Sequence, residues 1–423
     1  MPDGSATAHL FRPKLVTVTA EGYGIGSLRR DAVAGLTVAI VALPLSMAIA
    51  VASGVSPERG LYAAIVGGFL VSALGGSRFQ VGGPAGAFIV LVSAATANYG
   101  LDGLLLAVMM SGLFLTVIGL SGLGILIHRI PQAVTVGFTC GIAVTIAASQ
   151  LRDLGGLTLA GAEPGHLIPK LVALAATLPS INPGALAVGL GSAALILALR
   201  QWRPIWPGML IAVALASLAS SVLYLPVDTI GSRFGGIPHS LPLPALPSVS
   251  WSRLLELLPT AISFTLLGGV ESLLSAKIAD GMTGRKHRYN MEVVAQGVAN
   301  MASALFGGIC VTGTIARTAT NIRAGARCPI AGMLHALFLL IFMLLAAPLA
   351  NFIPLAALAG LLLVVCWNMA EKAEFAHLLR SWPSAVVLLA TFGLTLVADL
   401  TVGIVAGCIA AAAITLFGRR PLR

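Results

Sequence analysis

The chain has 423 residues; 57% are hydrophobic, only 9% are charged, and the net charge is +10. Because an average soluble domain has about a quarter charged residues, this composition argues against a soluble enzyme. The cations lie in short stretches between apolar runs, which is typical of membrane proteins, and no basic patch carries interleaved aromatic residues, so nucleic acid is not an expected partner. The five cysteines and the histidines show no metal-ligand spacing, so no metal or other cofactor is expected.

Fourteen apolar segments follow one another along the chain. A membrane span needs about 20 apolar residues, so the chain is long enough to cross a bilayer many times. The sequence predicts an all-α integral membrane protein with transmembrane segments over 31–418 and cytoplasmic ends at 1–30 and 419–423. The segments are 31–53, 60–76, 83–98, 102–127, 131–150, 168–199, 206–225, 256–280, 289–307, 314–326, 329–350, 354–370, 383–398 and 400–418.

Three stretches depart from simple spans. Pro179 and Pro183 break the segment 168–199, so its span is expected in the later half. The Pro- and Ser-rich stretch 226–255 is expected to be a long external loop, with an extended strand at Ile237–Leu246. Residues 371–380 are expected to form a short interfacial helix.

The cations support this topology. Fourteen crossings place both termini on the same side of the membrane. We expect the protein to lie in the inner (plasma) membrane with both termini in the cytoplasm. Of the 25 Lys and Arg residues, 19 then lie on the inner side, five on the outer side, and Arg317 within the membrane. This asymmetry is the one that the positive-inside rule predicts. The five outer cations are Arg59, Arg152, Lys170, Arg233 and Arg253.

The third and the tenth segments are unusually short and interrupted. Gly82-Gly83-Pro84-Ala85-Gly86 opens the third, and Thr312-Gly313-Thr314-Ile315-Ala316-Arg317 opens the tenth. Pro84 and Thr314 lie 230 residues apart, close to the offset of about 226 between the starts of the first and eighth segments. The offsets indicate two repeats of seven segments, inverted because seven is odd. Interrupted segments at matching places in two halves are the best sequence pointer to the binding site of a transporter.

These two starts are predicted to bind an anion between them. A helix start offers free N–H groups and a partial positive charge, small residues let an anion approach the backbone, and Arg317 adds a positive field. The alternative is that Arg317 pairs with a buried carboxylate or with carbonyl groups. The candidate substrate-binding residues are Ala85, Gly86, Ala87, Gly313, Thr314, Ile315, Ala316 and Arg317.

Glu271 is the most informative acid. Glu256 lies 15 residues before it and Arg285 14 after it, which places it about 21 Å from each, near the middle of the bilayer. An ionised acid there costs about 3 kcal/mol or more, so it needs a partner, a wet cavity or a proton. Ser275 lies one turn on, on the same face. We predict a coupling-ion site for a proton or a sodium ion at Glu271 and Ser275; the alternative is a structural acid.

The eighth to tenth segments carry a specific set of residues: Glu271-Ser-Leu-Leu-Ser-Ala-Lys-Ile-Ala-Asp280, then Asn290, Gln296-Gly297, Asn300, Gly307-Gly308 and Arg317-Thr-Ala-Thr-Asn321. This set closely resembles the sulfate permease family, which includes the animal solute carrier 26 anion exchangers. Asp31-Ala-Val-Ala-Gly35-Leu-Thr-Val with Pro44 resembles the first span of that family, and Asp399-Leu-Thr-Val-Gly403 its last. The resemblance covers nearly the whole chain.

The resemblance implies a mobile core domain (about 31–127 and 256–350) and a gate domain (about 131–225 and 354–418). The anion would lie between the starts of segments 3 and 10, and segment 1 would add Leu45 and Ile49. An acid and a hydroxyl at the places of Glu271 and Ser275 resemble the cation site of sodium-coupled relatives, and the acid looks proton-linked in plant relatives. A homodimer is also implied.

Two departures from the family stand out. Many members have Gln where this chain has Leu45, so one polar contact to the anion is missing. Most members continue into a cytoplasmic STAS domain, whereas this chain stops at Arg423, so the membrane domain alone is expected.

The sequence therefore predicts a secondary active transporter that carries a small anion across the bilayer by alternating access. Sulfate, bicarbonate, chloride and small dicarboxylates all fit. An anion beside Glu271 repels its ionised form, and either a proton or a sodium ion would neutralise that charge. Proton-coupled symport is favoured, because one hydroxyl and one carboxylate supply few oxygens for a sodium ion; sodium-coupled symport and anion exchange are the alternatives. A nucleobase carrier of the same general fold would need more polar side chains at both helix starts. Prolonged anion currents without a coupling gradient would identify a channel. An intramembrane enzyme would need a nucleophile–base pair or metal ligands at depth, and the sequence has neither.

Overall fold

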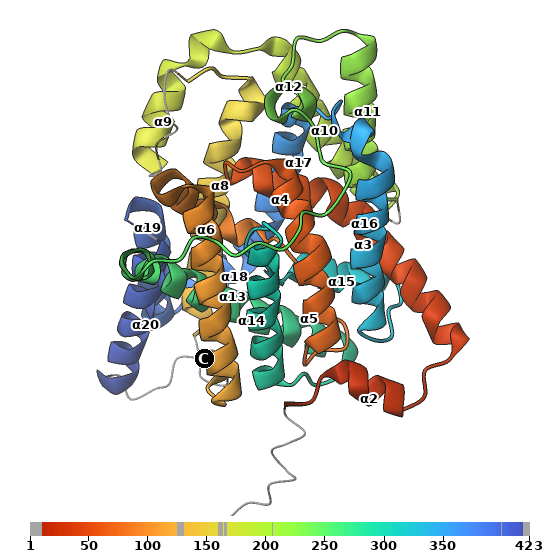
Figure 1. Cartoon of the computed structure of the whole chain (residues 1–423). Helices are drawn as coiled ribbons and strands as arrows, with labels where there is room; N and C mark the ends of the chain where they lie inside the picture. The colour runs from red at the N-terminus through yellow and green to blue at the C-terminus, as the bar shows by residue number, and fades with distance from the viewer. Residues whose placement is uncertain are drawn as a thin grey trace, which may run out of the picture. The chain divides into compact units, whose positions relative to one another are not determined.

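The structure, a computed structural model, describes residues 11–124, 131–159, 164, 167–204, 206–398 and 400–417. Arg129, Asp399 and the expected C-terminal end 419–423 lie outside these residues. The described chain is helical almost throughout (Figure 1), and its one sheet is a pair of two-residue strands. Seven of the described helices are long and apolar enough to cross a membrane, and four shorter apolar helices accompany them.

The chain divides into two compact units. Unit 1 contains residues 1–88, 92–128 and 230–352, and unit 2 contains 89–91, 129–229 and 353–423. The expected assignment of a core and a gate domain stays a prediction. The elements of unit 1 are α2 (Lys14–Ala20), α3 (Ile25–Ala52), α4 (Pro57–Tyr62), the π-helix Ala63–Gly67, α5 (Gly68–Leu74), β1 (Gly82–Gly83), the 3₁₀ turn Gly86–Phe88, α6 (Ile89–Leu120, beyond its first three residues), α12 (Ile230–Phe234), α13 (Trp251–Thr283), α14 (Tyr289–Leu305), β2 (Thr312–Gly313), α15 (Ile315–Arg323) and α16 (Ile330–Ala350).

Unit 2 is built from helices that pack closely through small residues. A Cβ on Gly137 of α8 would lie 2.6 Å from the Leu388 carbonyl oxygen of α19, and Gly360 of α17 meets Gly189 of α10 in the same way. Such contacts are typical of membrane helices, because small residues let their backbones approach. The elements of unit 2 are α8 (Gln132–Gly155), α9 (Leu167–Ala176), the 3₁₀ turn Leu178–Ser180, α10 (Pro183–Trp202), α11 (Gly208–Val222), α17 (Leu355–Met369), α18 (Lys372–Leu378), α19 (Trp382–Val397) and α20 (Leu400–Phe417).

Local signals in the sequence account for several helix ends. Asn182 caps α10 by accepting hydrogen bonds from the N–H groups of Gly184 (2.9 Å) and Ala185 (3.2 Å), directly before a Pro at the first helical position. Gly284 ends α13 in the left-handed conformation, with φ 69°, which glycine adopts without strain. Gly100, also with φ 69°, interrupts α6 between two expected segments.

Each of the fourteen expected segments contains helix, and the break in 168–199 falls between α9 and α10. The number of crossings and the inverted repeat stay predictions. The helix expected in 371–380 is confirmed as α18, and its place at the membrane interface stays a prediction. The expected strand at Ile237–Leu246 is wrong: the segment is irregular, because Pro238, Pro242 and Pro244 have no N–H to give to a ladder.

Candidate functional site

The two interrupted starts meet inside unit 1. β1 pairs antiparallel with β2, with Gly82 opposite Gly313 and Gly83 opposite Thr312. A side chain at two of these positions would displace a buried neighbour: a Cβ on Gly83 would overlap the guanidinium of Arg317, and a Cβ on Gly313 would overlap the amide of Gln80. Because the chain turns from each strand into a helical turn within a few residues, the pairing brings the 3₁₀ turn Gly86–Phe88 and the start of α15 together within unit 1.

The start of α15 leaves its N–H groups available to a ligand. The first N–H groups of a helix have no acceptor within it, and the N-cap residue Thr314 makes no capping bond with its side chain. Its hydroxyl donates to the Val81 carbonyl oxygen instead (3.4 Å), and its N–H donates to the same oxygen (3.1 Å). The partial positive charge of this helix start is therefore not offset by its own cap.

Small residues surround the two starts. Ala316 is exposed, Ile315 and Gly86 are half-buried, and Ala85 and Thr314 each keep 8% of their surface exposed. Ala87 and Gly313 are buried. Apart from Thr314 and Ile315, the side chains that limit access to the backbone of the two starts are of alanine and glycine size.

Arg317 is buried, with 2% of its surface exposed, and it has partners within unit 1. One Nη donates to the Gly82 carbonyl oxygen (3.4 Å), and the other donates to the Pro84 carbonyl oxygen (3.3 Å) and the Ser46 hydroxyl (3.0 Å). Its Nε has no hydrogen-bond partner among the described residues. Arg317 thus pairs with carbonyl groups, as the alternative to anion binding predicted. Its side chain also connects α15 to α3 and to the start of segment 3. A role in anion binding stays a prediction.

Glu271 and Ser275 lie buried on α13, which packs against α15. The Ser275 hydroxyl donates to the Thr318 hydroxyl (3.2 Å). Thr318 Oγ1 also accepts from the Val81 N–H (3.2 Å), which immediately precedes β1. One threonine of α15 therefore links the helix of Glu271 to the strand that leads into segment 3.

The two residues of segment 1 that the resemblance implied, Leu45 and Ile49, are buried on α3. The polar contact from this helix comes from Ser46, which lies between them and accepts from Arg317. Ser46 is one of the site residues that sequence reasoning missed. Its position in the sequence could have identified it, because it follows Pro44, the residue that interrupts the first segment, by two residues.

Gln80 was missed as well. Its Nε2 donates to the Ser272 carbonyl oxygen (3.2 Å) and hydroxyl (3.0 Å), one residue after Glu271. No single-sequence signal identifies it, because a glutamine next to a glycine pair reads as an ordinary loop residue. Together with Thr318, it holds the strand before segment 3 against α13.

The strand before segment 10 is held from the other side by α14. Asn300 donates to the Val311 carbonyl oxygen (2.8 Å) and accepts from the Val311 N–H (2.8 Å), and Gln296 donates to the same carbonyl. Buried Glu292 of the same helix accepts from the Ser77 N–H (2.8 Å) and so anchors the turn before segment 3. Among the described residues, no cluster of three or more His, Cys, Asp and Glu side chains could hold a metal ion.

Comparisons with known proteins agree with this geometry. A family model, the sulfate permease family, matches residues 28–392. The putative sulfate transporter YvdB of Bacillus subtilis is 41% identical over 395 residues, which are 92% of this chain and 74% of that protein. The bicarbonate transporter BicA of Picosynechococcus is 32% identical over 405 residues, covering 92% of this chain and 70% of that protein.

Two solved structures share the fold. The transmembrane domain of a cyanobacterial bicarbonate transporter BicA aligns with a TM-score of 0.79 and 30% identity, over 92% of this chain and 98% of that one. The murine Slc26a9 anion transporter in the inward-facing state aligns with a TM-score of 0.89 and 18% identity, over 99% of this chain and 73% of that one. The chain therefore belongs to the sulfate permease family. Because its relatives are named as transporters, it is a multi-pass membrane transporter and not an enzyme.

Proposed function

We propose that this chain is a secondary active transporter of small anions, which it binds between the 3₁₀ turn Gly86–Phe88 and the start of α15. The observation that carries the proposal is the pairing of Gly82–Gly83 with Thr312–Gly313, which brings two helix starts together. Helix starts are ready-made anion sites, and here the residues around them are small. Relatives named as sulfate and bicarbonate transporters support small oxyanions as the substrate class.

In this proposal Arg317 has two roles. Its bonds to Gly82, Pro84 and Ser46 hold the two starts in register. Its positive charge also stays in the site, because hydrogen bonds to neutral oxygens do not cancel it. The missing polar group at Leu45 is offset in part by Ser46, which orients the guanidinium from the same helix.

The coupling ion is proposed to be a proton on Glu271. The bonds from Ser275 to Thr318 and from Val81 to Thr318 give α13 a polar connection to both starts. A change in the charge of Glu271 could thus reach the anion. An anion and an ionised Glu271 repel each other, so anion and proton would move together. Sodium held by Glu271 and Ser275 is the alternative, since it would neutralise the same charge.

The remaining parts of the proposal concern the cycle and its setting. Unit 1 would act as the core that moves and unit 2 as the gate, so that the site faces each side of the membrane in turn. The chain would lie in the inner (plasma) membrane with both termini in the cytoplasm, and would pair as a homodimer. Labelling a single cysteine at position 287 from the outside of intact cells would contradict this orientation.

Uptake into proteoliposomes tests the proposal. Sulfate, bicarbonate, chloride and a small dicarboxylate are offered under an imposed pH gradient or an imposed sodium gradient. We expect uptake of at least one of these anions to depend on the pH gradient. Glu271→Gln, which mimics the protonated acid, should bind anion but lose accumulation. The exposed Glu256 at the start of the same helix supplies the matched control, Glu256→Gln, which should behave as the wild type.

Each other outcome has a separate meaning. Accumulation driven only by sodium identifies the sodium-coupled alternative. Counterflow without a gradient identifies an exchanger. Full accumulation by Glu271→Gln under a pH gradient removes Glu271 from coupling.

A further inference from the structure

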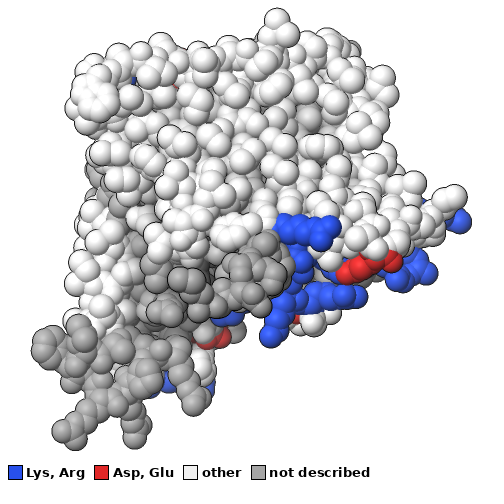
Figure 2. Space-filling view, turned by 60° about the horizontal axis from the view of Figure 1, so that its bottom comes forward, with Lys and Arg blue, Asp and Glu red and all other residues white. Residues whose placement is uncertain are grey.

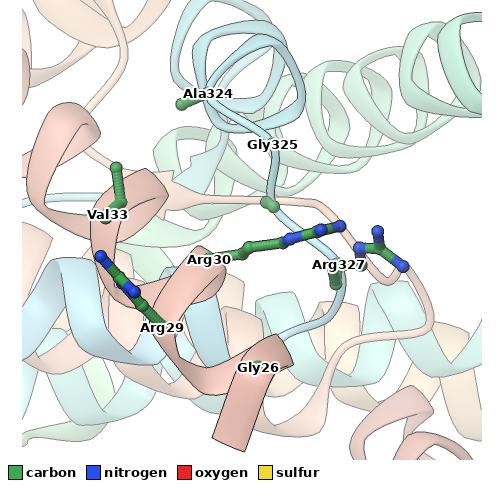
Figure 3. A pocket seen from close by; sticks show the side chains of 8 residues that line it. Gly26, Arg29, Arg30, Val33, Ala324, Gly325 and Arg327 are labelled. Carbon is green, nitrogen blue, oxygen red and sulfur yellow. The ribbon is translucent and has the colours of Figure 1, made fainter.

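A pocket with three arginines lies in unit 1, away from the paired strands. It has a volume of about 800 Å³ and is formed by the first two turns of α3 and the loop that joins α15 to α16. Arg29, Arg30 and Arg327 line it, all with exposed side chains. Figure 3 shows the Arg30 side chain reaching from α3 toward Arg327. On the face drawn in Figure 2, Lys and Arg side chains gather in one region, and most of the remaining surface carries no charge.

These three arginines have no acidic partner within the part of the chain that the structure describes. The nearest acid in the sequence to Arg29 and Arg30 is Asp31, which is fully buried and bonds to other groups. Its carboxylate accepts from the Arg327 N–H (2.6 Å), from the Cys328 N–H (3.4 Å) and thiol (2.9 Å), and from the Tyr23 hydroxyl (2.8 Å). Burial and the neighbouring carboxylate raise the pKa of Tyr23, so this hydroxyl stays a donor.

Asp31 therefore stabilises the shape of the pocket but is not one of the residues that line it. By binding the backbone at Arg327 and Cys328, it holds the loop after α15 against α3 and presents Arg327 beside Arg30. Like charges brought together in this way repel each other, and an anion between them would relieve the repulsion. The fold thus maintains a cationic pocket whose charge balance has to come from outside the described chain.

The rim of the pocket is apolar on one side. Val33 lines the pocket and is 56% exposed, and Leu36, one turn further along α3, is 37% exposed. α3 is one of the helices long and apolar enough to span a membrane, and these exposed residues continue from the arginines toward its middle. A ligand that matches both parts needs a negative group and an alkyl chain attached to it.

We propose that this pocket binds an anionic phospholipid, with the phosphate of the headgroup between Arg30 and Arg327 and an acyl chain along Val33 and Leu36. Basic pockets next to membrane helices bind acidic headgroups in this way, and the arginine fork matches phosphate oxygens. The site is independent of the proposed anion path, because none of its residues belongs to β1, β2 or the starts of α6 and α15.

Native mass spectrometry of the purified full chain tests the proposal, with phosphatidylglycerol as the probe and phosphatidylcholine as the neutral comparison. We expect phosphatidylglycerol to bind and the variant Arg30→Gln/Arg327→Gln to bind it roughly thirtyfold more weakly, the equivalent of about 1 kcal/mol for each arginine. The charge-preserving variant Arg30→Lys/Arg327→Lys should bind with an affinity between those of the wild type and the Gln variant, because lysine keeps the charge but lacks the fork. Because both side chains are exposed, their replacement should leave the melting temperature of the delipidated protein unchanged.

Arg323, exposed at the end of α15 but outside the pocket, supplies the matched control. Arg323→Gln should change phosphatidylglycerol affinity by less than about twofold; an effect as large as that of Arg30→Gln would mean a diffuse surface field and would overturn the pocket. Equal binding of phosphatidylcholine, or unchanged binding by the double variant, would also overturn it. Inorganic phosphate and glycerol 3-phosphate, which lack acyl chains, should not displace the lipid at equal concentration. Displacement by either one identifies a free-anion site and contradicts the lipid.

Discussion

The two units bury their polar side chains in different ways. In unit 1 several of these side chains join elements that are far apart in the sequence, as Gln80 does with Ser272 and Glu292 with the Ser77 N–H. In unit 2 most buried hydroxyls bond within their own helices, and buried Lys170 of α9, which donates to Ser149 of α8, is an exception. Five buried hydroxyls there each donate to the carbonyl oxygen four residues earlier: Thr139, Thr145, Ser192, Thr391 and Thr395.

This difference separates two ways of holding membrane helices together. A hydroxyl bonded to its own helix costs little to bury and joins nothing, so unit 2 relies on close packing at small residues such as Gly137. Cross-element bonds in unit 1 hold non-helical backbone, which is tolerated at membrane depth only where it is buried in protein or lines a cavity. The polar connections of unit 1 thus make the paired strands possible, and the candidate site depends on them.

The largest effect should come from filling the space between the paired strands. Gly83→Ala places a Cβ on the Arg317 guanidinium, and Gly313→Ala places one on the Gln80 amide. Either change must displace a buried side chain that bonds to the neighbouring elements, and a displacement of about 1 Å in a site can lower a rate by about 100-fold. We expect at least this loss in initial uptake rate, measured in proteoliposomes.

Gly191 in α10 of unit 2 is the matched control. A Cβ there meets no atom within 4 Å, so Gly191→Ala should transport as the wild type does. If Gly83→Ala keeps more than half of the wild-type rate while Gly191→Ala behaves normally, the pairing of the strands is not required for transport.

A smaller loss is expected from Arg317→Lys. Lysine keeps the positive charge, but it cannot reach the three acceptors at Gly82, Pro84 and Ser46 with a planar fork. Each lost bond from a charged donor is worth about 1.5–3 kcal/mol, so we expect about a tenfold or larger decrease in anion affinity, measured by titration calorimetry. Full affinity in Arg317→Lys would mean that the field of the charge suffices. The bonds to segments 1 and 3 would then be incidental.

Much of the fold could be predicted from the sequence, because apolar length is a local property. Helix is present in every expected segment, and the meeting of the two interrupted starts followed from their matching places in the two halves. The expected strand at Ile237–Leu246 failed for a local reason too, since alternation of apolar residues was given more weight than the prolines among them.

The partners within the site could not be predicted. Arg317 was expected to face the anion, and no single-sequence pattern indicates that Gly82, Pro84 and Ser46 lie within its reach. Gln80 donates to Ser272, which lies 192 residues further along the chain. Thr318 accepts from Val81, which lies 237 residues before it. Such contacts depend on how helices stack, whereas composition and spacing report only on neighbours along the chain.

The smallest effect should come from a pair of identical substitutions, one in each unit. Thr318→Val in unit 1 removes the acceptor of the Val81 N–H and of the Ser275 hydroxyl. A buried donor left without a partner costs about 1–3 kcal/mol, so we expect a loss of stability of this size and a fall in gradient-driven uptake of about fivefold or more, which corresponds to the lower bound of about 1 kcal/mol. Thr391→Val in unit 2 removes a hydroxyl that donates only to the Val387 carbonyl oxygen of its own helix. Valine occupies the same volume there and the helix keeps its backbone bonds, so the change in melting temperature and in uptake should be small.

Thermal unfolding of the two purified variants, followed by uptake in proteoliposomes, compares them directly. Equal effects in the two units would contradict the distinction between hydroxyls that join elements and hydroxyls that do not, even if both variants transport normally.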